Sequence, residues 1–155
     1  MRTAYARGTV PLQPAAALAL WTDVDRWPTF IEGFARVLER SPGWPAEGER
    51  VSWESSPGGR GRVTEKVVEQ GADRFSTMVF ESALMGRQTF RAVPHTVGAE
   101  VELSLEYTLV KYGPLSVVAD ALFIRRALRD SLARTVGRFA VEAEEEAGLR
   151  EPPLR

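Results

Sequence analysis

The chain has 155 residues, of which 44% are apolar and 26% charged, and these proportions are those of one folded globular domain with a substantial core. Its 20 basic and 21 acidic side chains leave a formal charge of -1, so no overall field draws it to phosphate backbones, and we expect no nucleic-acid partner. The chain contains no cysteine, which excludes disulfides, thiolate nucleophiles and cysteine-ligated metal sites.

The N-terminal residues show no targeting or membrane segment. Residues 1–11 carry Arg2 and Arg7 among alternating residue types, and they lack the apolar run of a signal peptide. No apolar stretch of the chain reaches the length of a membrane span. We therefore expect a cytoplasmic protein, as a monomer or homodimer, with no integral membrane segment, no metal and no cofactor.

The beginning of the chain predicts one strand followed by two short helices. Residues 3–11 mix small, aromatic and β-branched types and end at a proline, which favours an opening strand. Pro14 and the alanine- and leucine-rich segment after it favour a helix that ends near Asp23. Residues 25–33 contain Trp27-Pro28 and end at a glycine, which predicts a second short helix or a tight turn.

From Phe34 the pattern changes to short runs rich in valine, phenylalanine and threonine. Turn residues separate these runs at Pro42-Gly43, Pro57-Gly58-Gly59, Gly71-Ala72-Asp73, Met85-Gly86 and Val97-Gly98. The clearest strand covers residues 100–110, where the apolar positions are Val101, Leu103, Leu105, Tyr107 and Leu109. Because short turns join the strands, we predict an antiparallel meander with one buried face.

The last part of the chain predicts one long amphipathic helix. After Tyr112-Gly113-Pro114 it reaches about Gly148 with apolar residues at Val118, Leu122, Leu128, Leu132, Val136 and Phe139. Charged residues on this helix are spaced for ion pairs along it, namely Arg126/Asp130, Asp130/Arg134 and Arg138/Glu142. Pro152-Pro153 cannot continue a helix, so residues 150–155 are predicted to form a short frayed tail.

These elements together predict an α+β fold. A strongly twisted antiparallel sheet of about six to seven strands curls around the long C-terminal helix, and two short helices follow the first strand. Residues 1–149 are predicted to form a single domain.

The segment from Trp21 to Phe30, with Asp23-Val24 and Trp27-Pro28, resembles the START-like (SRPBCC) superfamily of polyketide cyclases/dehydrases and lipid transport proteins. The glycine-rich hairpin 58–61, the turn from Val93-Pro94 to Glu100-Val101 and the arginine-studded segment 134–139 agree with this resemblance, which spans nearly the whole chain. It implies a Bet v 1-type helix-grip fold with an internal cavity between sheet and helix. The partner that it implies is a hydrophobic small molecule: a lipid, a quinone or a polycyclic or polyketide compound.

The sequence leaves two alternatives to simple ligand binding open. The phrase Asp23-Val24-x-x-Trp27-Pro28-x-Phe30 is most similar to bacterial aromatic polyketide aromatase/cyclases, which implies action on a poly-β-ketone. In those enzymes an arginine on a mid-sheet strand helps to bind and enolise the substrate, whereas the corresponding position here is Gln70. The second alternative is a non-enzymatic partner protein of a respiratory or translation-related assembly.

Few residues qualify as catalytic candidates. Either Glu65 or Lys66 points into the predicted cavity, where an unpaired charge would be functional because burying it is costly. In a cyclase, Tyr107 and an inward arginine of the long helix, Arg126 or its neighbour Arg125, would be the proton donor and the enolate stabiliser.

Other titratable residues have simpler explanations. His95 is the only histidine and follows a proline in a predicted turn, which indicates an exposed loop residue. Glu100, Glu102 and Glu106 alternate with apolar residues, which is typical of a solvated outer strand face.

The predicted ligand-binding residues are mainly aromatic and apolar side chains, with a few polar groups that would orient the ligand. They are Trp27, Phe30, Trp53, Val67, Phe75, Gln88, Phe90, Tyr107, Leu122, Phe123 and Arg126. The resemblance places the segment of Trp27 and Phe30 near the mouth of the cavity.

Overall fold

The structure is a computed structural model that describes residues 1–110 and 117–150, with the backbone alone for residues 117–121. The chain begins with β1 (Arg2–Val10), α1 (Pro14–Thr22), a 3-10 turn η1 (Val24–Arg26) and α2 (Trp27–Phe30). Pro14 occupies the first turn of α1, where its missing N–H is not needed, and the carboxylate of Asp23 accepts a hydrogen bond from the backbone of Asp25 (3.2 Å) at the start of η1. The predicted strand and two short helices are confirmed.

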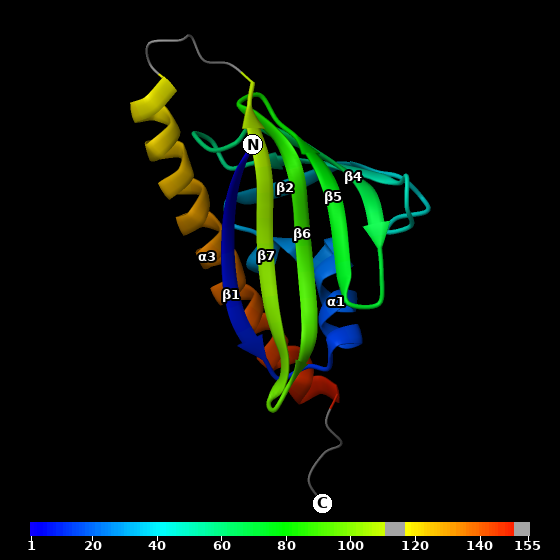
Figure 1. Ribbon diagram of the computed structural model, residues 1–155. Helices are drawn as coiled ribbons and strands as arrows, with labels where there is room; N and C mark the ends of the chain where they lie inside the picture. The colour runs from blue at the N-terminus through cyan, green and yellow to red at the C-terminus, as the bar shows by residue number, and fades with distance from the viewer. Residues whose placement is uncertain (111–116, 151–155) are drawn as a thin grey trace, which may run out of the picture.

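Six strands follow, and with β1 they form one antiparallel sheet. They are β2 (Phe34–Arg40), β3 (Arg50–Ser55), β4 (Arg62–Gln70), β5 (Arg74–Phe80), β6 (Leu84–His95) and β7 (Gly98–Leu109). The order across the seven-stranded sheet is β1-β7-β6-β5-β4-β3-β2, which is the predicted meander with the first strand added beside the last (Figure 1). β1 pairs with β7 along its whole length, from Arg2 opposite Tyr107 to Val10 opposite Ala99.

One predicted turn is wrong, because Met85 and Gly86 lie inside β6. The chain reverses at residues 81–83 instead, where the N–H of Glu81 donates to the carbonyl of Leu84 (3.1 Å). Gly86 has a different role. A Cβ at this position would lie 2.2 Å from the carbonyl oxygen of Glu106, so β6 and β7 approach too closely there for any side chain.

The long C-terminal helix is confirmed as α3 (Val117–Arg150). Tyr112-Gly113-Pro114 and the predicted tail from residue 151 lie outside the described residues, as does the side chain of Val118. The predicted ion pairs along the helix are not those that form in the described part of α3. Arg134 and Arg138 both pair with Glu32 (3.0 and 2.9 Å), and Glu142 pairs with Arg26, because α3 packs against the segment that holds these two partners.

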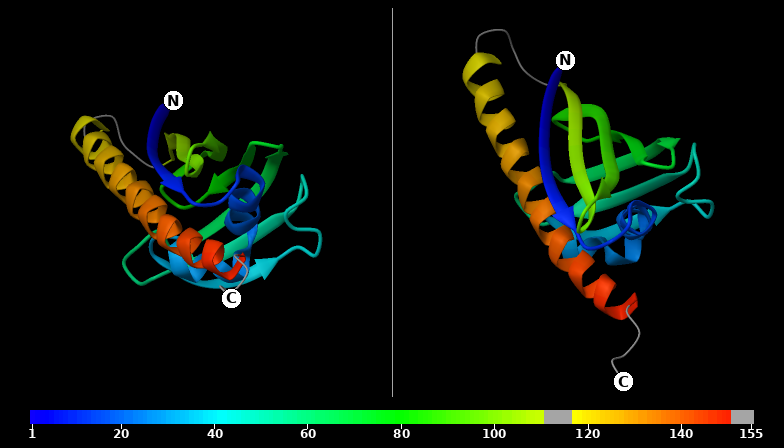
Figure 2. Two further views of the ribbon diagram at one scale, coloured as in Figure 1. Left: turned by 90° about the horizontal axis from the view of Figure 1, so that it is seen from below. Right: turned by 60° about the horizontal axis from the view of Figure 1, so that its bottom comes forward.

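Helix α3 packs mainly on β1 and α2, so it runs along one edge of the sheet and crosses the concave side near α2 (Figure 2). A Cβ on Gly8 would lie 2.9 Å from a methyl carbon of Val136, which shows how closely the helix approaches β1 there. The C-terminal half of α3 is further held by Arg26, which donates to Glu142 and to Glu146 (3.0 Å). No helix in the described ranges is both long enough and apolar enough to cross a membrane.

Stacked aromatic rings fill the concave side where α1, α2 and α3 meet. Trp21 stacks on Phe90 with centroids 4.5 Å apart, and Phe139 packs edge-on against both Phe90 (5.1 Å) and Phe30 (5.2 Å). Such offset and edge-on ring pairs add to the free energy of apolar burial. This curved sheet around a C-terminal helix is the helix-grip arrangement, so the predicted fold class is confirmed.

Candidate ligand-binding site

The concave face of β4 carries a buried carboxyl group, that of Glu65, whose side chain is 4% exposed. Val63 and Val67 are buried on the same face, two residues away on either side. Lys66 is only partly buried and lies on the opposite, outer face of the strand, as the alternation along a strand requires. The structure therefore settles which of the two adjacent charged residues points inward.

Three side chains donate hydrogen bonds to the Glu65 carboxyl group. Trp53 Nε1 lies 2.8 Å from Oε2, Thr77 Oγ1 lies 2.9 Å from Oε1, and Gln88 Nε2 lies 3.4 Å from Oε1. These donors come from β3, β5 and β6, so four neighbouring strands build the group. We call Glu65, Trp53, Thr77 and Gln88 the Glu65 group.

Burial raises the pKa of Glu65 above its ordinary value, and the hydrogen bonds from Trp53 and Thr77 lower it by less. The reason is that an ionised carboxylate loses its hydration in this apolar surrounding. Glu65 is thus an acid that keeps its proton to a higher pH than an exposed glutamate does. It can donate that proton in a hydrogen bond.

Arg60 and Glu81 form an ion pair next to this group. Arg60 Nε lies 2.5 Å from Glu81 Oε2, and the Glu81 side chain is 5% exposed. The guanidinium carbon of Arg60 lies 5.3 Å from the centroid of the Trp53 ring, a distance suited to a cation–π contact. The positive charge of Arg60, which lowers the pKa of Glu65, is therefore already balanced by Glu81.

Tyr107 lies on the concave face of β7, opposite Gly86 of β6 and Arg2 of β1. Its side chain is 1% exposed, and its hydroxyl has no hydrogen-bond partner among the described residues. Arg2 Nη1 is equally buried and without a partner in that part of the chain. Two buried hydrogen-bond donors are thus unsatisfied on neighbouring strands.

Besides Trp53, Val67 and Tyr107, four more of the predicted site residues belong to the packed core. Trp27, Phe30, Phe75 and Phe90 are all buried. Trp27 donates to the carbonyl of Trp21 (2.7 Å), and Trp27 and Phe30 lie among packed rings rather than at a surface opening.

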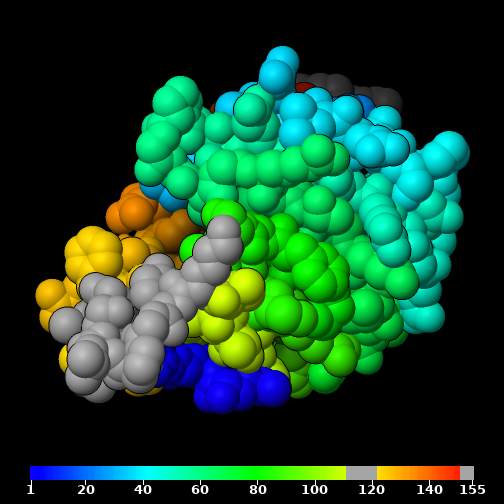
Figure 3. Space-filling view, turned by 90° about the horizontal axis from the view of Figure 1, so that it is seen from above, coloured from blue at the N-terminus to red at the C-terminus, as the bar shows by residue number. Residues whose placement is uncertain are grey.

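The predicted residues of α3 lie apart from the Glu65 group. Leu122 and Phe123 are 64% and 74% exposed, and Arg126 is exposed as well. With Arg125 and Arg129 they line a surface cavity of about 530 Å³, whose described lining includes no member of the Glu65 group. Seen from above, this part of α3 forms one side of the molecule beside β1 and the end of β7 (Figure 3).

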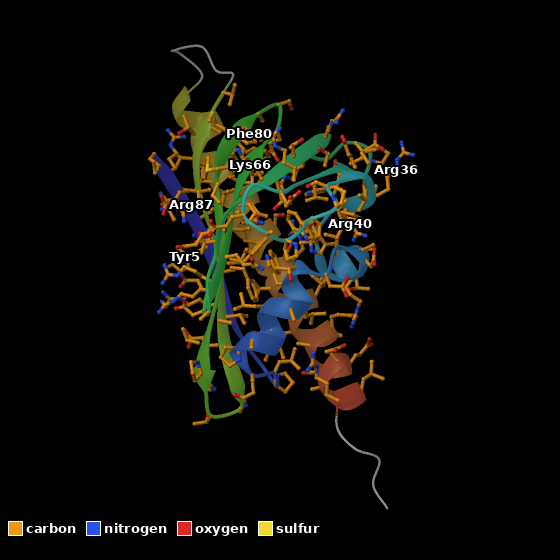
Figure 4. The ribbon with its side chains drawn as sticks, turned by 90° about the vertical axis from the view of Figure 1, so that its right-hand side faces the viewer. Tyr5, Arg36, Arg40, Lys66, Phe80 and Arg87 are labelled. Carbon is orange, nitrogen blue, oxygen red and sulfur yellow. The ribbon has the colours of Figure 1, made fainter. Side chains whose placement is uncertain are left out.

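The outer face of the sheet is polar, as predicted. Glu102 pairs there with Arg7 (2.5 Å), and His95 is exposed at the end of β6. Figure 4 shows Tyr5 and Arg87 on this outer side, away from the helices. The three alternating glutamates of β7 are therefore not part of the concave site.

Four polar residues of the concave side were not among the predicted site residues: Arg2, Arg60, Thr77 and Glu81. Arg2 alternates with Ala4, Ala6 and Gly8, and Thr77 lies between Phe75 and Val79, so period-two alternation contained a signal for both. The Arg60–Glu81 pair joins two turns that are distant in sequence, and no local pattern indicates it.

Fold and site together define a helix-grip protein of the START-like superfamily, with a buried acid on the concave face of its sheet. The family model described as "Polyketide cyclase / dehydrase and lipid transport" matches residues 1–144. The chain therefore belongs to the polyketide cyclase/dehydrase and lipid transport family.

Solved structures with the same fold include TTHA0849 from Thermus thermophilus, at a TM-score of 0.76 and 15% identity over 94% of this chain and 99% of that chain. The Zhui aromatase/cyclase from Streptomyces sp. R1128 has a TM-score of 0.70 and 16% identity, and the match covers 94% of each chain. The di-domain ARO/CYC StfQ from the steffimycin biosynthetic pathway has a TM-score of 0.74 and 18% identity, over 94% of this chain and 51% of that chain. At these identities the likeness is one of fold. No curated protein sequence matches the chain.

Proposed function

We propose that this protein binds an apolar small molecule between the concave face of the sheet and helix α3, with an oxygen atom of the ligand at the Glu65 group. The observation that carries the proposal is the buried acid Glu65 on a face lined mostly by valine, leucine and aromatic side chains. Burying a carboxyl group there reduces stability. A ligand that accepts a hydrogen bond from Glu65 would explain why a carboxyl group occupies this buried position.

The chemistry of the group indicates what it would recognise. The indole of Trp53 has one N–H, which is already donated to Glu65 at 2.8 Å, so the proton that the group can offer to a ligand is that of a protonated Glu65. The complementary ligand atom is a carbonyl or hydroxyl oxygen on a largely apolar skeleton. Most of the affinity would come from apolar burial, and the hydrogen bond would set the orientation.

The test is a titration with a neutral, apolar fluorophore, N-phenyl-1-naphthylamine, whose emission rises in apolar surroundings. We expect saturable binding to one site, and competition by a carbonyl compound such as a long-chain methyl ketone. Glu65→Gln keeps the shape and removes the acid, so competition by the ketone should weaken about three- to tenfold while binding of the fluorophore changes little.

Glu106→Gln is the matched control, because Glu106 is an exposed glutamate on the outer face of β7. It should leave both measurements unchanged. Absence of saturable binding, or equal effects of the two substitutions, would contradict the proposal.

A second candidate function is polyketide cyclisation, favoured by the buried Glu65, whose pKa is raised by the loss of hydration. An aldol ring closure joins an enol carbon to a ketone carbon, places a proton on the ketone oxygen and releases the proton of the enol hydroxyl. A buried acid can supply the first proton, and its carboxylate can take up the second. The family description and the aromatase/cyclase neighbours are compatible with this reaction. Gln70, at the position that corresponds to the cyclase arginine, is exposed at the end of β4, so this chain would need a different group to stabilise the enolate.

Cyclisation is tested with a synthetic poly-β-ketone thioester and product analysis by mass spectrometry. A cyclase would change the ratio of ring-closed products over the spontaneous reaction, and Glu65→Gln would lower that rate by about 100-fold. If the product ratio is unchanged and the ligand still binds, cyclisation is contradicted and ligand binding remains as the proposed function.

A further inference from the structure

Arg2 of the edge strand β1 and Tyr107 of its neighbour β7 lie at directly opposed positions and on the same, concave face. Opposed residues of an antiparallel pair have Cβ atoms about 5 Å apart, so their side chains start as neighbours. Tyr107 is 1% exposed, and both its hydroxyl and Arg2 Nη1 are buried without a hydrogen-bond partner in the described part of the chain. Arg2 as a whole is only partly buried, but a guanidinium N–H that is buried without a partner costs free energy because it loses its hydration.

The rest of β1 explains why Arg2 faces inward. The same face of the strand carries Ala4, Ala6, Gly8 and Val10, and Gly8 lies directly against Val136 of α3. The outward residues of the strand include Arg7, which pairs with Glu102 on the outer face. Arg2 is therefore the inward arginine of a strand whose other arginine already has its counter-ion.

We infer that Arg2 and Tyr107 form an anion subsite, which binds the carboxylate of an apolar carboxylic acid held on the concave face. Both groups donate hydrogen bonds, and an arginine with a hydroxyl is a common donor set for a carboxylate. The inference rests on the proposed function, because it names the chemical class of that ligand. It also places the charged end of the ligand away from Glu65.

Charge balance favours this subsite over the Glu65 group for an anion. Glu65 is an acid, and Arg60 beside it is paired with Glu81 at 2.5 Å, so no uncommitted positive charge among the described residues adjoins that group. Arg2 and Glu65 are separated by β7, β6 and β5 in the sheet. At about 4.8 Å per strand, the two positions lie about 19 Å apart along the curved sheet.

The experiment is isothermal titration calorimetry of the whole chain with decanoate and with decan-1-ol, which share a chain length and differ in charge. We expect wild type to prefer decanoate, and Arg2→Gln and Tyr107→Phe each to weaken decanoate about tenfold while changing decan-1-ol by less than twofold. Arg2→Lys keeps the charge and should restore part of the preference. Arg7→Gln, on the outer face of the same strand, is the matched control and should change neither affinity.

The outcomes separate the two proposals. Equal affinity for the acid and the alcohol in wild type, or equal losses for both in the variants, would overturn the anion subsite and leave the binding function standing. Binding of neither compound would overturn both. Circular dichroism of each variant establishes that it is folded, and Arg2→Lys provides a second reading if Arg2→Gln unfolds.

Discussion

Glu65 shows how burial and hydrogen bonding oppose each other at a single residue. Its carboxyl group accepts from Trp53, Thr77 and Gln88, yet the loss of hydration raises its pKa more than these donors lower it. A residue of this kind lowers the stability of the fold when it is ionised. This cost in stability is the observation on which the proposed binding function rests.

The raised pKa makes a prediction about stability. Because the folded state holds the Glu65 proton more tightly than the unfolded chain does, its contribution is fully present below the ordinary glutamate pKa of about 4.5 and is lost as pH rises through the folded pKa. Glu65→Gln has no such proton. The free energy of unfolding of wild type minus that of Glu65→Gln should therefore fall as pH rises above about 4.5, as measured by urea denaturation at a series of pH values.

The same series with Glu106→Gln provides the comparison, since Glu106 is exposed. The free energy of unfolding of wild type minus that of Glu106→Gln should not fall in this way as pH rises. A wild type that gains stability relative to Glu65→Gln with rising pH would mean that Glu65 is ionised and stabilised in the folded state.

At the scale of elements, α3 combines an ordered C-terminal half with apolar residues exposed at its other end. The C-terminal half is buried against β1 and α2 and held by the ion pairs of Arg26 and Glu32, whereas Leu122 and Phe123 are exposed. The apolar stripe that periodicity predicts is therefore covered over only part of the helix. Periodicity shows which face is apolar, and the position of the partner element decides how much of that face is covered.

Two glycines in regular elements should respond oppositely to alanine. Gly137 is exposed within α3, and a Cβ there would meet nothing within 4 Å, so Gly137→Ala should raise the free energy of unfolding by about 0.5–1 kcal/mol. Gly86→Ala should lower it by about 1–3 kcal/mol, because its Cβ would collide with the backbone of β7. Chemical denaturation of both variants measures this, and equal changes would contradict the strand packing described here.

At the scale of the whole molecule, the ends of the chain hold the fold together. β1 pairs with β7, and α3 packs on β1 and α2. The N-terminal elements therefore complete the sheet and form the surface on which the final helix packs. Both ends of the chain are therefore needed to complete the sheet and the packing of the final helix.

This connectivity supports the prediction that residues 1–149 are one domain, and it implies one cooperative unfolding transition. The four tryptophans are buried or partly buried on the inner side, so their fluorescence reports the core, while far-UV circular dichroism reports the strands and α3. The two signals should give the same urea midpoint. Separate midpoints would indicate that a part of the chain unfolds independently.

The sequence alone determined the order of elements, the meander, the long helix and the family resemblance, because alternation, helical periodicity and turn residues act over short stretches of chain. For the same reason it predicted that Val101, Leu103, Leu105 and Tyr107 share one buried face of their strand. It did not resolve Glu65 from Lys66, since both belong to a run in which either register was possible.

Only the tertiary structure decided which distant residues meet. The pairing of β1 with β7 brings Arg2 beside Tyr107, four strands bring Trp53, Thr77 and Gln88 to Glu65, and two turns bring Arg60 to Glu81. The placement of α3 along β1 leaves Leu122, Phe123 and Arg126 exposed. These contacts depend on long-range register and on how elements pack, and neither leaves a periodic signal in the sequence.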